Sequence, residues 1–195
     1  MPTCQACYGQ RMKFSPNHPA GSLKHLTERA EILASGCPRC HSTTALGPHG
    51  HLRGNSPTDG SRVNRGLRFF CSNRYSNLGC GGSFSVHWTT VIPYCSVRTS
   101  QLLALMRAVS NAASTHRAWW FLKLPMSLAS AYRWVARWRS DTAAIRTRLG
   151  LVTPPPGRID GLPDSLTLRH LAAAFPLANC QIAAFHGHLQ VPISG

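Results

Sequence analysis

Residues 37–40 are CPRC and residues 71–84 are CSNRYSNLGCGGSF, and these two stretches decide the fold that the sequence predicts. They carry two pairs of cysteines, and Cys71 follows Cys40 by 31 positions. Four thiolates brought together from two turns complete the tetrahedral coordination of a structural zinc ion. The metal supplies folding free energy that a small β unit cannot obtain from burial alone. We therefore expect one zinc ion, with Cys37, Cys40, Cys71 and Cys80 as its ligands.

Other ligand sets remain open on the residues alone. Cys4 and Cys7 form another C-x2-C pair, and they could join Cys37 and Cys40 in place of the more widely spaced second pair. Imidazole also binds zinc, so single histidines could replace a thiolate; the candidates are His41, His49, His51 and His87. Reduced cysteines without metal are the third interpretation. Cys95 and Cys180 have no neighbouring cysteine and are best explained as ordinary buried thiols.

The pattern of apolar residues predicts an α+β fold with four regions. Residues 1–35 form a weakly structured lead-in, and residues 36–95 a small β unit, in which Phe84, Val86 and Trp88 alternate with polar residues as in a half-buried strand. Residues 96–150 have apolar residues at helical spacing. Thr99 or Ser100 is expected to cap the first helix there, and residues 151–195 form a Pro-rich linker and a weakly structured tail.

The longest predicted helix follows a break at residues 125–127, where Ser127 is expected to cap it and Gly150 to end it. Its apolar residues fall on one face, and Arg133, Arg137 and Arg148 fall on another. A recognition helix of a helix-turn-helix unit has this division, because one face packs on its partner helix and the other enters the major groove.

The charge balance predicts a polyanionic partner. The chain has 21 Lys and Arg residues against 6 Asp and Glu residues, a formal net charge of +15 and a pI near 10.6. Between the cysteine pairs, arginines alternate with aromatic residues, a combination that can hold phosphates while a ring packs on sugar or base. The expected nucleic-acid contacts there are Arg62, Arg65, Arg68 and Arg74, with the rings mostly in the core.

The cysteine-bearing segment resembles the zinc-ribbon class, in which a CPxC turn, an aromatic strand and a Cys-Gly turn enclose one zinc ion. The matching residues are Cys37, Pro38, Cys40, the strand LRFFC ending at Cys71, and Cys80, Gly81, Gly82 and Phe84. The second pair departs from this pattern, because it is C-x8-C where C-x2-C is usual. A zinc ribbon followed by a helix-turn-helix resembles the DNA-binding modules of bacterial insertion-sequence transposases, over roughly residues 36–150.

This resemblance implies a zinc-dependent protein that binds duplex DNA in transposition or transcription, with a transposase or a second copy of the chain as a compatible partner. An RNA-binding zinc ribbon is the alternative. Nothing commits the chain to catalysis, since the few carboxylates suggest no two-metal site. A His-metal nuclease is the second alternative, with His49, His51 and Asn55 in a loop between the cysteine pairs.

The sequence also predicts a reducing, cytoplasmic and nucleoid-associated location with no membrane partner. The N-terminal residues lack the charged and apolar order of a secretory signal, and no run of 18 apolar residues occurs. Eight cysteines in such a compartment favour metal binding over disulfides.

Overall fold

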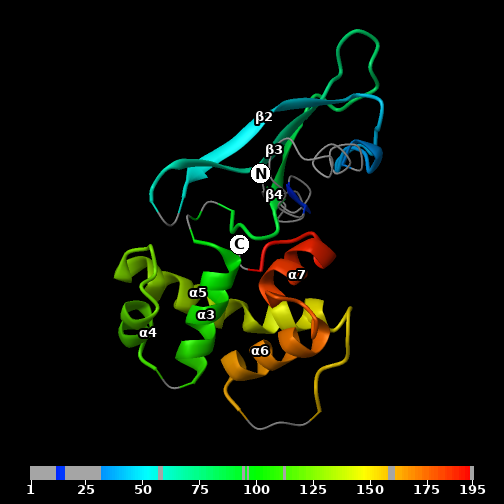
Figure 1. Cartoon of the computed structure of the whole chain (residues 1–195). Helices are drawn as coiled ribbons and strands as arrows, with labels where there is room; N and C mark the ends of the chain where they lie inside the picture. Colours follow the sequence, from blue (N-terminus) through cyan, green and yellow to red (C-terminus); the bar gives the residue numbers. More distant parts are fainter. Residues whose placement is uncertain are drawn as a thin grey trace, which may run out of the picture. The chain divides into compact units, whose positions relative to one another are not determined.

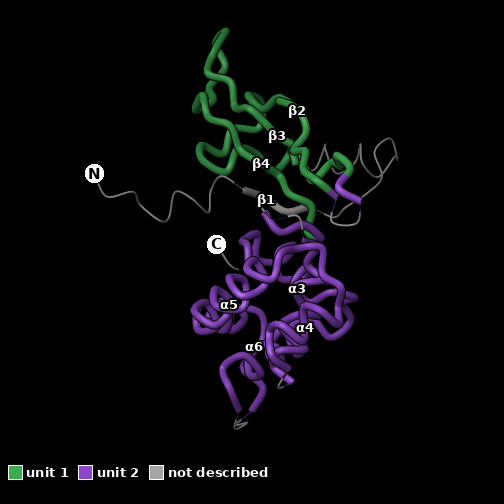
Figure 2. Tube along the Cα trace, turned by 90° about the vertical axis from the view of Figure 1, so that its left-hand side faces the viewer, with its two compact units in different colours: residues 1–55, 61–89 green, residues 56–60, 90–195 purple. Residues whose placement is uncertain are grey.

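The computed structural model of the chain describes residues 12–15, 32–56, 59–93, 95, 97–111, 113–157 and 161–193. The structure is α+β, with one sheet and a set of helices (Figure 1). It divides into two compact units (Figure 2). Residues 1–55 and 61–89 make the first, which we call the sheet unit, and residues 56–60 and 90–195 make the second, the helical unit.

In its described residues, the sheet unit has four strands in the order β1-β4-β3-β2. The strands are β1 (Met12–Ser15), β2 (Leu46–Asn55), β3 (Arg62–Cys71) and β4 (Ser83–Trp88). β2 pairs with β3 and β3 with β4, both antiparallel, whereas β1 adds a parallel edge strand in the register Met12 to Ser85. β1 lies in the segment expected to be weakly structured, and no local pattern reveals it because its partner is distant in sequence.

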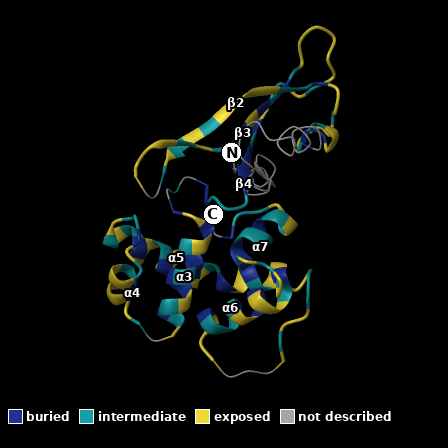
Figure 3. Ribbon diagram, viewed as in Figure 1, coloured by how far each residue is buried: buried dark blue, intermediate teal, exposed yellow. Residues whose placement is uncertain are grey.

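The sheet packs its alternating apolar residues on one another. Phe84, Val86 and Trp88 are buried, which confirms the alternation seen in the sequence. Phe69 of β3 is also buried, and its ring stacks on that of Phe84 with 5.6 Å between centroids and 17° between planes. β2 is different, because most of its residues are exposed (Figure 3).

The helical unit contains α3 (Thr99–Ser110), α4 (Thr115–Phe121), α5 (Leu128–Leu149), α6 (Pro163–Ala174) and α7 (Gln181–Leu189). Ser127 caps α5 as expected, since its hydroxyl accepts a hydrogen bond from the Ser130 backbone N–H at 3.2 Å. The cap expected at Thr99 or Ser100 is wrong. Arg98 holds that position, and its backbone N–H donates to Oε1 of Gln101 at 3.0 Å.

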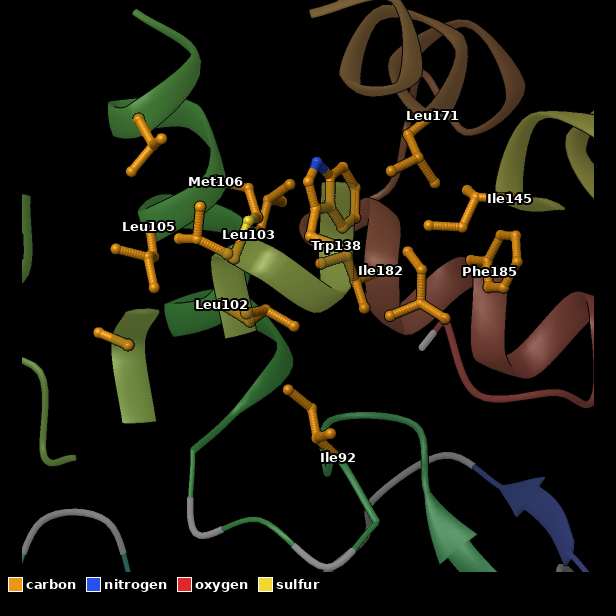
Figure 4. Packing of buried hydrophobic residues seen from close by; sticks show 14 of the residues in the cluster. Ile92, Leu102, Leu103, Leu105, Met106, Trp138, Ile145, Leu171, Ile182 and Phe185 are labelled. Carbon is orange, nitrogen blue, oxygen red and sulfur yellow. The ribbon is translucent and has the colours of Figure 1, made fainter. Parts of the chain in front are cut away.

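The core of the helical unit draws on all five of these helices, with Ala118 as the buried core residue of α4, and Figure 4 shows part of it. α3 contributes Leu102, Leu105 and Met106, and α5 contributes Trp138 and Ile145, all of them at most 1% exposed. α6 and α7 complete this core with Leu171, Ile182 and Phe185, none of which is exposed.

The expectation of a weakly structured tail after residue 150 is therefore wrong. α6 is tied to α5 by an ion pair in which Nε of Arg139 donates to Asp164 at 2.9 Å. After α7, the backbone N–H of Ile193 donates to Nε2 of the fully buried His186 at 3.2 Å. No single helical period runs through this segment of the sequence, because Pro176 separates two short helices. Among the described residues, none of the helices combines the length and apolar character that a membrane span requires.

Candidate metal centre and basic surfaces

The sheet unit brings four cysteines together at one end of the β2–β3 pair. Cys37 and Cys40 lie in the turn before β2, Cys71 ends β3, and Cys80 precedes β4. Their four sulfur atoms lie within 4.8 Å of one another, with 3.7 Å between Cys37 and Cys80 and 3.5 Å between Cys40 and Cys71. Zinc binds thiolates at about 2.3 Å, so a tetrahedral site puts sulfurs about 3.8 Å apart. The cluster therefore has the dimensions of a four-thiolate metal site.

The first cysteine turn is shaped by backbone hydrogen bonds around Cys37. The N–H of Cys37 donates to the carbonyl of Ser42, and the N–H of His41 donates to the carbonyl of Cys37, both at 2.9 Å. The N–H of Arg39 points at Sγ of Cys37 at 3.5 Å. A backbone N–H that donates to sulfur stabilises a thiolate, because this hydrogen bond is made to the charged form.

The second cysteine turn explains how the unusual C-x8-C spacing is accommodated. The N–H of Ser72 donates to the carbonyl of Ala45 at 2.8 Å, and the N–H of Cys80 donates to Sγ of Cys71 at 3.4 Å. A Cβ atom on Gly79 would lie 2.1 Å from the Ser72 carbonyl oxygen and 2.8 Å from Sγ of Cys71. Glycine at this position lets the chain return to the cluster, so residues 72–79 form an excursion between two ligands.

The thiols of the cluster differ in acidity. Burial raises the pKa of Cys71 to about 12 and also raises the pKa of Cys80, whereas the Ser42 backbone hydrogen bond lowers the pKa of Cys40 to about 7. Without a cation, the buried sulfur of Cys71 keeps its proton, because the Cys71 thiolate would be desolvated and close to other thiols. A divalent metal ion reverses this preference and deprotonates the thiols that coordinate it.

The structure thus groups the four cysteines named from the sequence. Cys4 and Cys7, which were the alternative pair, lie outside the described residues. In the part of the chain that the structure describes, no histidine joins the cluster and no second group of three or more potential metal ligands occurs. His49, His51 and Asn55 lie on strand β2 and not in a loop as expected, and Nδ1 of His51 is 3.1 Å from Nδ2 of Asn64.

The arginines of the sheet unit differ in their surroundings. Arg62 and Arg68 on β3 and Arg74 in the excursion are exposed. Arg65 is half-buried, and its Nη1 donates to the Asn55 carbonyl at 3.3 Å. The expectation that the neighbouring rings are mostly core holds for Phe69 but not for Tyr75, which is 94% exposed.

On α5, the two predicted faces are separate. Val135, Trp138 and Ile145 are buried, while Arg133, Arg137 and Arg148 are exposed. The side chains of these three arginines make different contacts. Nη2 of Arg133 donates to Oγ of Ser130 at 3.1 Å, and the guanidinium of Arg137 lies 5.5 Å from the centroid of the Trp134 ring. Nη1 of Arg148 lies 3.4 Å from the carbonyl of Pro192, beyond α7.

Comparisons with protein-family models, with curated proteins and with solved structures found no match.

Proposed function

We propose that the chain is a zinc-dependent DNA-binding protein that acts in transposition or in transcriptional regulation. The cluster of Cys37, Cys40, Cys71 and Cys80 carries this proposal. Four thiolates in a tetrahedral set favour zinc over harder cations, which prefer oxygen ligands. A closed set of four protein ligands leaves no position for substrate, so the metal has a structural role. The metal holds the end of β3 next to the start of β4, and it thereby fixes the positions of the arginines on β3.

Exposed arginines support nucleic acid as the partner. The net charge of +15 attracts polyanions, and Arg62 and Arg68 lie exposed on β3 while Arg133 and Arg137 lie exposed on α5. Guanidinium groups bind phosphates or a guanine edge in two places at once. We infer that α4, the turn at residues 122–127 and α5 act as a helix-turn-helix-like unit, with the basic face of α5 toward the major groove.

Salt dependence of binding tests this proposal. Zinc-loaded protein should bind a DNA duplex with an affinity that falls steeply between 50 and 200 mM salt, because each neutralised phosphate contributes about 0.9 to the slope of log K against log salt. The double variant Arg62→Ala with Arg68→Ala should lower that slope by up to about 1.8. Arg169→Ala, which removes an exposed charge from α6, is the matched control and should change it less.

Two results would contradict the proposal. A slope near zero for the wild-type protein rejects electrostatic binding to DNA. Tighter binding to a structured RNA than to the duplex, at the same salt, would assign the protein to the RNA-binding class.

A further inference from the structure

The first half of α5 and the turn before it line a solvent-open hollow of about 710 Å³. Ligand pockets in proteins measure about 300–1,000 Å³, so the hollow has room for a small organic group. Its lining includes Met126 from the turn and Ser130, Arg133, Trp134 and Arg137 from α5. All lining residues belong to the helical unit.

The charge in the hollow is of one sign. Arg133 and Arg137 line it, and no carboxylate does so among the described residues. Among the described residues, the Arg133 guanidinium forms one hydrogen bond, to Oγ of Ser130 at 3.1 Å, and a guanidinium has five N–H donors. The remaining donors suit the oxygens of a phosphate, which arginine binds through two parallel hydrogen bonds.

The hollow also has an aromatic wall. Trp134 is half-buried, packs against the core of the helical unit and carries the Arg137 guanidinium 5.5 Å from its ring centroid. Another part of the lining is held in place, because Nε1 of Trp119 donates to the carbonyl of Met126 at 2.7 Å. A planar group with an anionic substituent matches this combination of a ring and two guanidinium groups.

We propose that the hollow binds one unpaired nucleotide of a DNA strand, with its base against Trp134 and its phosphates on Arg133 and Arg137. This inference rests on the proposed function and deepens it, since such a hollow would let the protein distinguish strand ends or distorted sites from continuous duplex. A base inside a continuous duplex is stacked on both sides and cannot offer its face to Trp134. An acidic peptide would satisfy the arginines but would leave the indole without a planar partner.

The test compares a blunt duplex with the same duplex carrying a short single-stranded overhang, using fluorescence anisotropy and the zinc-loaded full chain. Stacking contributes about 1–3 kcal/mol per base, so the overhang should tighten binding about 5- to 150-fold. Trp134→Leu keeps apolar bulk against the core but removes the stacking surface. It should abolish most of this preference and change blunt-duplex binding by a smaller factor, because Arg137 stays in place but loses its contact with the ring. Trp120→Leu is the control, because Trp120 lies on α4, is 71% exposed and does not line the hollow.

Several outcomes would overturn the inference. The first is equal binding of the blunt and overhang duplexes by the wild type. The second is a preference for the overhang that persists in Trp134→Leu. The third is displacement of the overhang duplex by an acidic peptide as readily as by single-stranded DNA of equal charge. If Trp134→Leu does not fold, the exposed Arg137→Ala replaces it and must weaken overhang binding more than blunt binding. Absence of all nucleic-acid binding would reject the proposed function too, whereas duplex binding without the overhang preference rejects only the inference.

Discussion

Gly79 has the least space for a side chain of the glycines around the cysteine cluster. Because an added Cβ atom would lie 2.1 Å from the Ser72 carbonyl oxygen, Gly79→Ala must push the backbone of the second cysteine turn away from Cys71. Overpacking of this kind costs about 1–3 kcal/mol. We expect Gly79→Ala to lower both metal affinity and the stability of the sheet unit, measured by zinc competition titration and by urea unfolding.

Gly47→Ala is the matched control for that substitution. Gly47 lies on β2, and nothing lies within 4 Å of the position that its Cβ atom would take. Its variant should bind metal like the wild type. Equal effects of the two substitutions would show that the close approach at Gly79 does not shape the site.

His87 on β4 gives the sheet unit a pH dependence of its own. Burial, and secondarily the charge of Arg65, lowers the pKa of His87 to about 4, whereas an unfolded chain has a histidine pKa of about 6.5. The unfolded state therefore takes up a proton first as the pH falls, and stability is lost between about pH 6.5 and pH 4. From pH 7 to pH 5 the loss attributable to His87 should be about 1–2 kcal/mol.

Urea unfolding of the wild type and of His87→Gln at both pH values checks this prediction. The variant cannot be protonated at that position, so its stability should change less over the same interval. An identical pH dependence in the two proteins would assign the acid sensitivity to other groups, the cysteine cluster foremost.

At the scale of elements, α6 and α7 are parts of the helical core. Phe185 of α7 is fully buried among residues of that core. Phe185→Ala should therefore lower the free energy of unfolding of the helical unit by about 3–5 kcal/mol, the usual cost of removing a buried phenylalanine side chain.

The control for Phe185 lies a few residues away. Leu177 follows α6 and is 97% exposed, so Leu177→Ala should change the free energy of unfolding by less than about 0.5 kcal/mol. Denaturant unfolding followed by tryptophan fluorescence measures both variants. A negligible effect of Phe185→Ala would mean that the C-terminal helices are dispensable.

The elements also show which features local sequence patterns can predict. α5 was predictable because its apolar residues keep helical spacing over several turns and Ser127 is a good capping residue. The start of α3 was not, because Gln101 provides its cap from within the helix. β1 was missed for a different reason: four residues carry little pattern, and their pairing partner lies on β4.

The metal cluster was predictable because cysteine spacing is a local signal with a specific chemical meaning. The hollow beside Trp134 was not, because its lining combines α5 with the turn at Met126 and with Cys95, which the chain brings together only in the folded helical unit. Arg133 and Arg137 were identified as exposed arginines of a helix face, but their relation to an indole ring required the structure.

For the whole molecule, the two units should respond differently to loss of metal. We expect a zinc ion bound at the cluster to supply much of the stability of the sheet unit, since zinc binding to structural sites is worth about 10–16 kcal/mol at pH 7 in zinc-finger peptides. The helical unit has a core of its own. Elemental analysis should find about one zinc ion per chain, and chelation should unfold the sheet unit while the helices persist.

Amide hydrogen exchange before and after chelation distinguishes the two units. Protection should be lost in β2, β3 and β4 and kept in α3 and α5. Cys71→Ser should reproduce the effect of chelation, whereas Cys180→Ser, which changes a half-buried thiol outside the cluster, should not. A folded sheet unit without metal would contradict this account.

The excursion of residues 72–79 has a practical consequence for engineering. Its two ends are fixed by backbone hydrogen bonds, at Ser72 and at Cys80, while Tyr75 and Leu78 between them are 94% and 88% exposed. The interior of such a loop can be exchanged for a foreign peptide as long as Gly79 is kept. The second cysteine turn is thus a suitable place for grafting new recognition segments between two anchored ends.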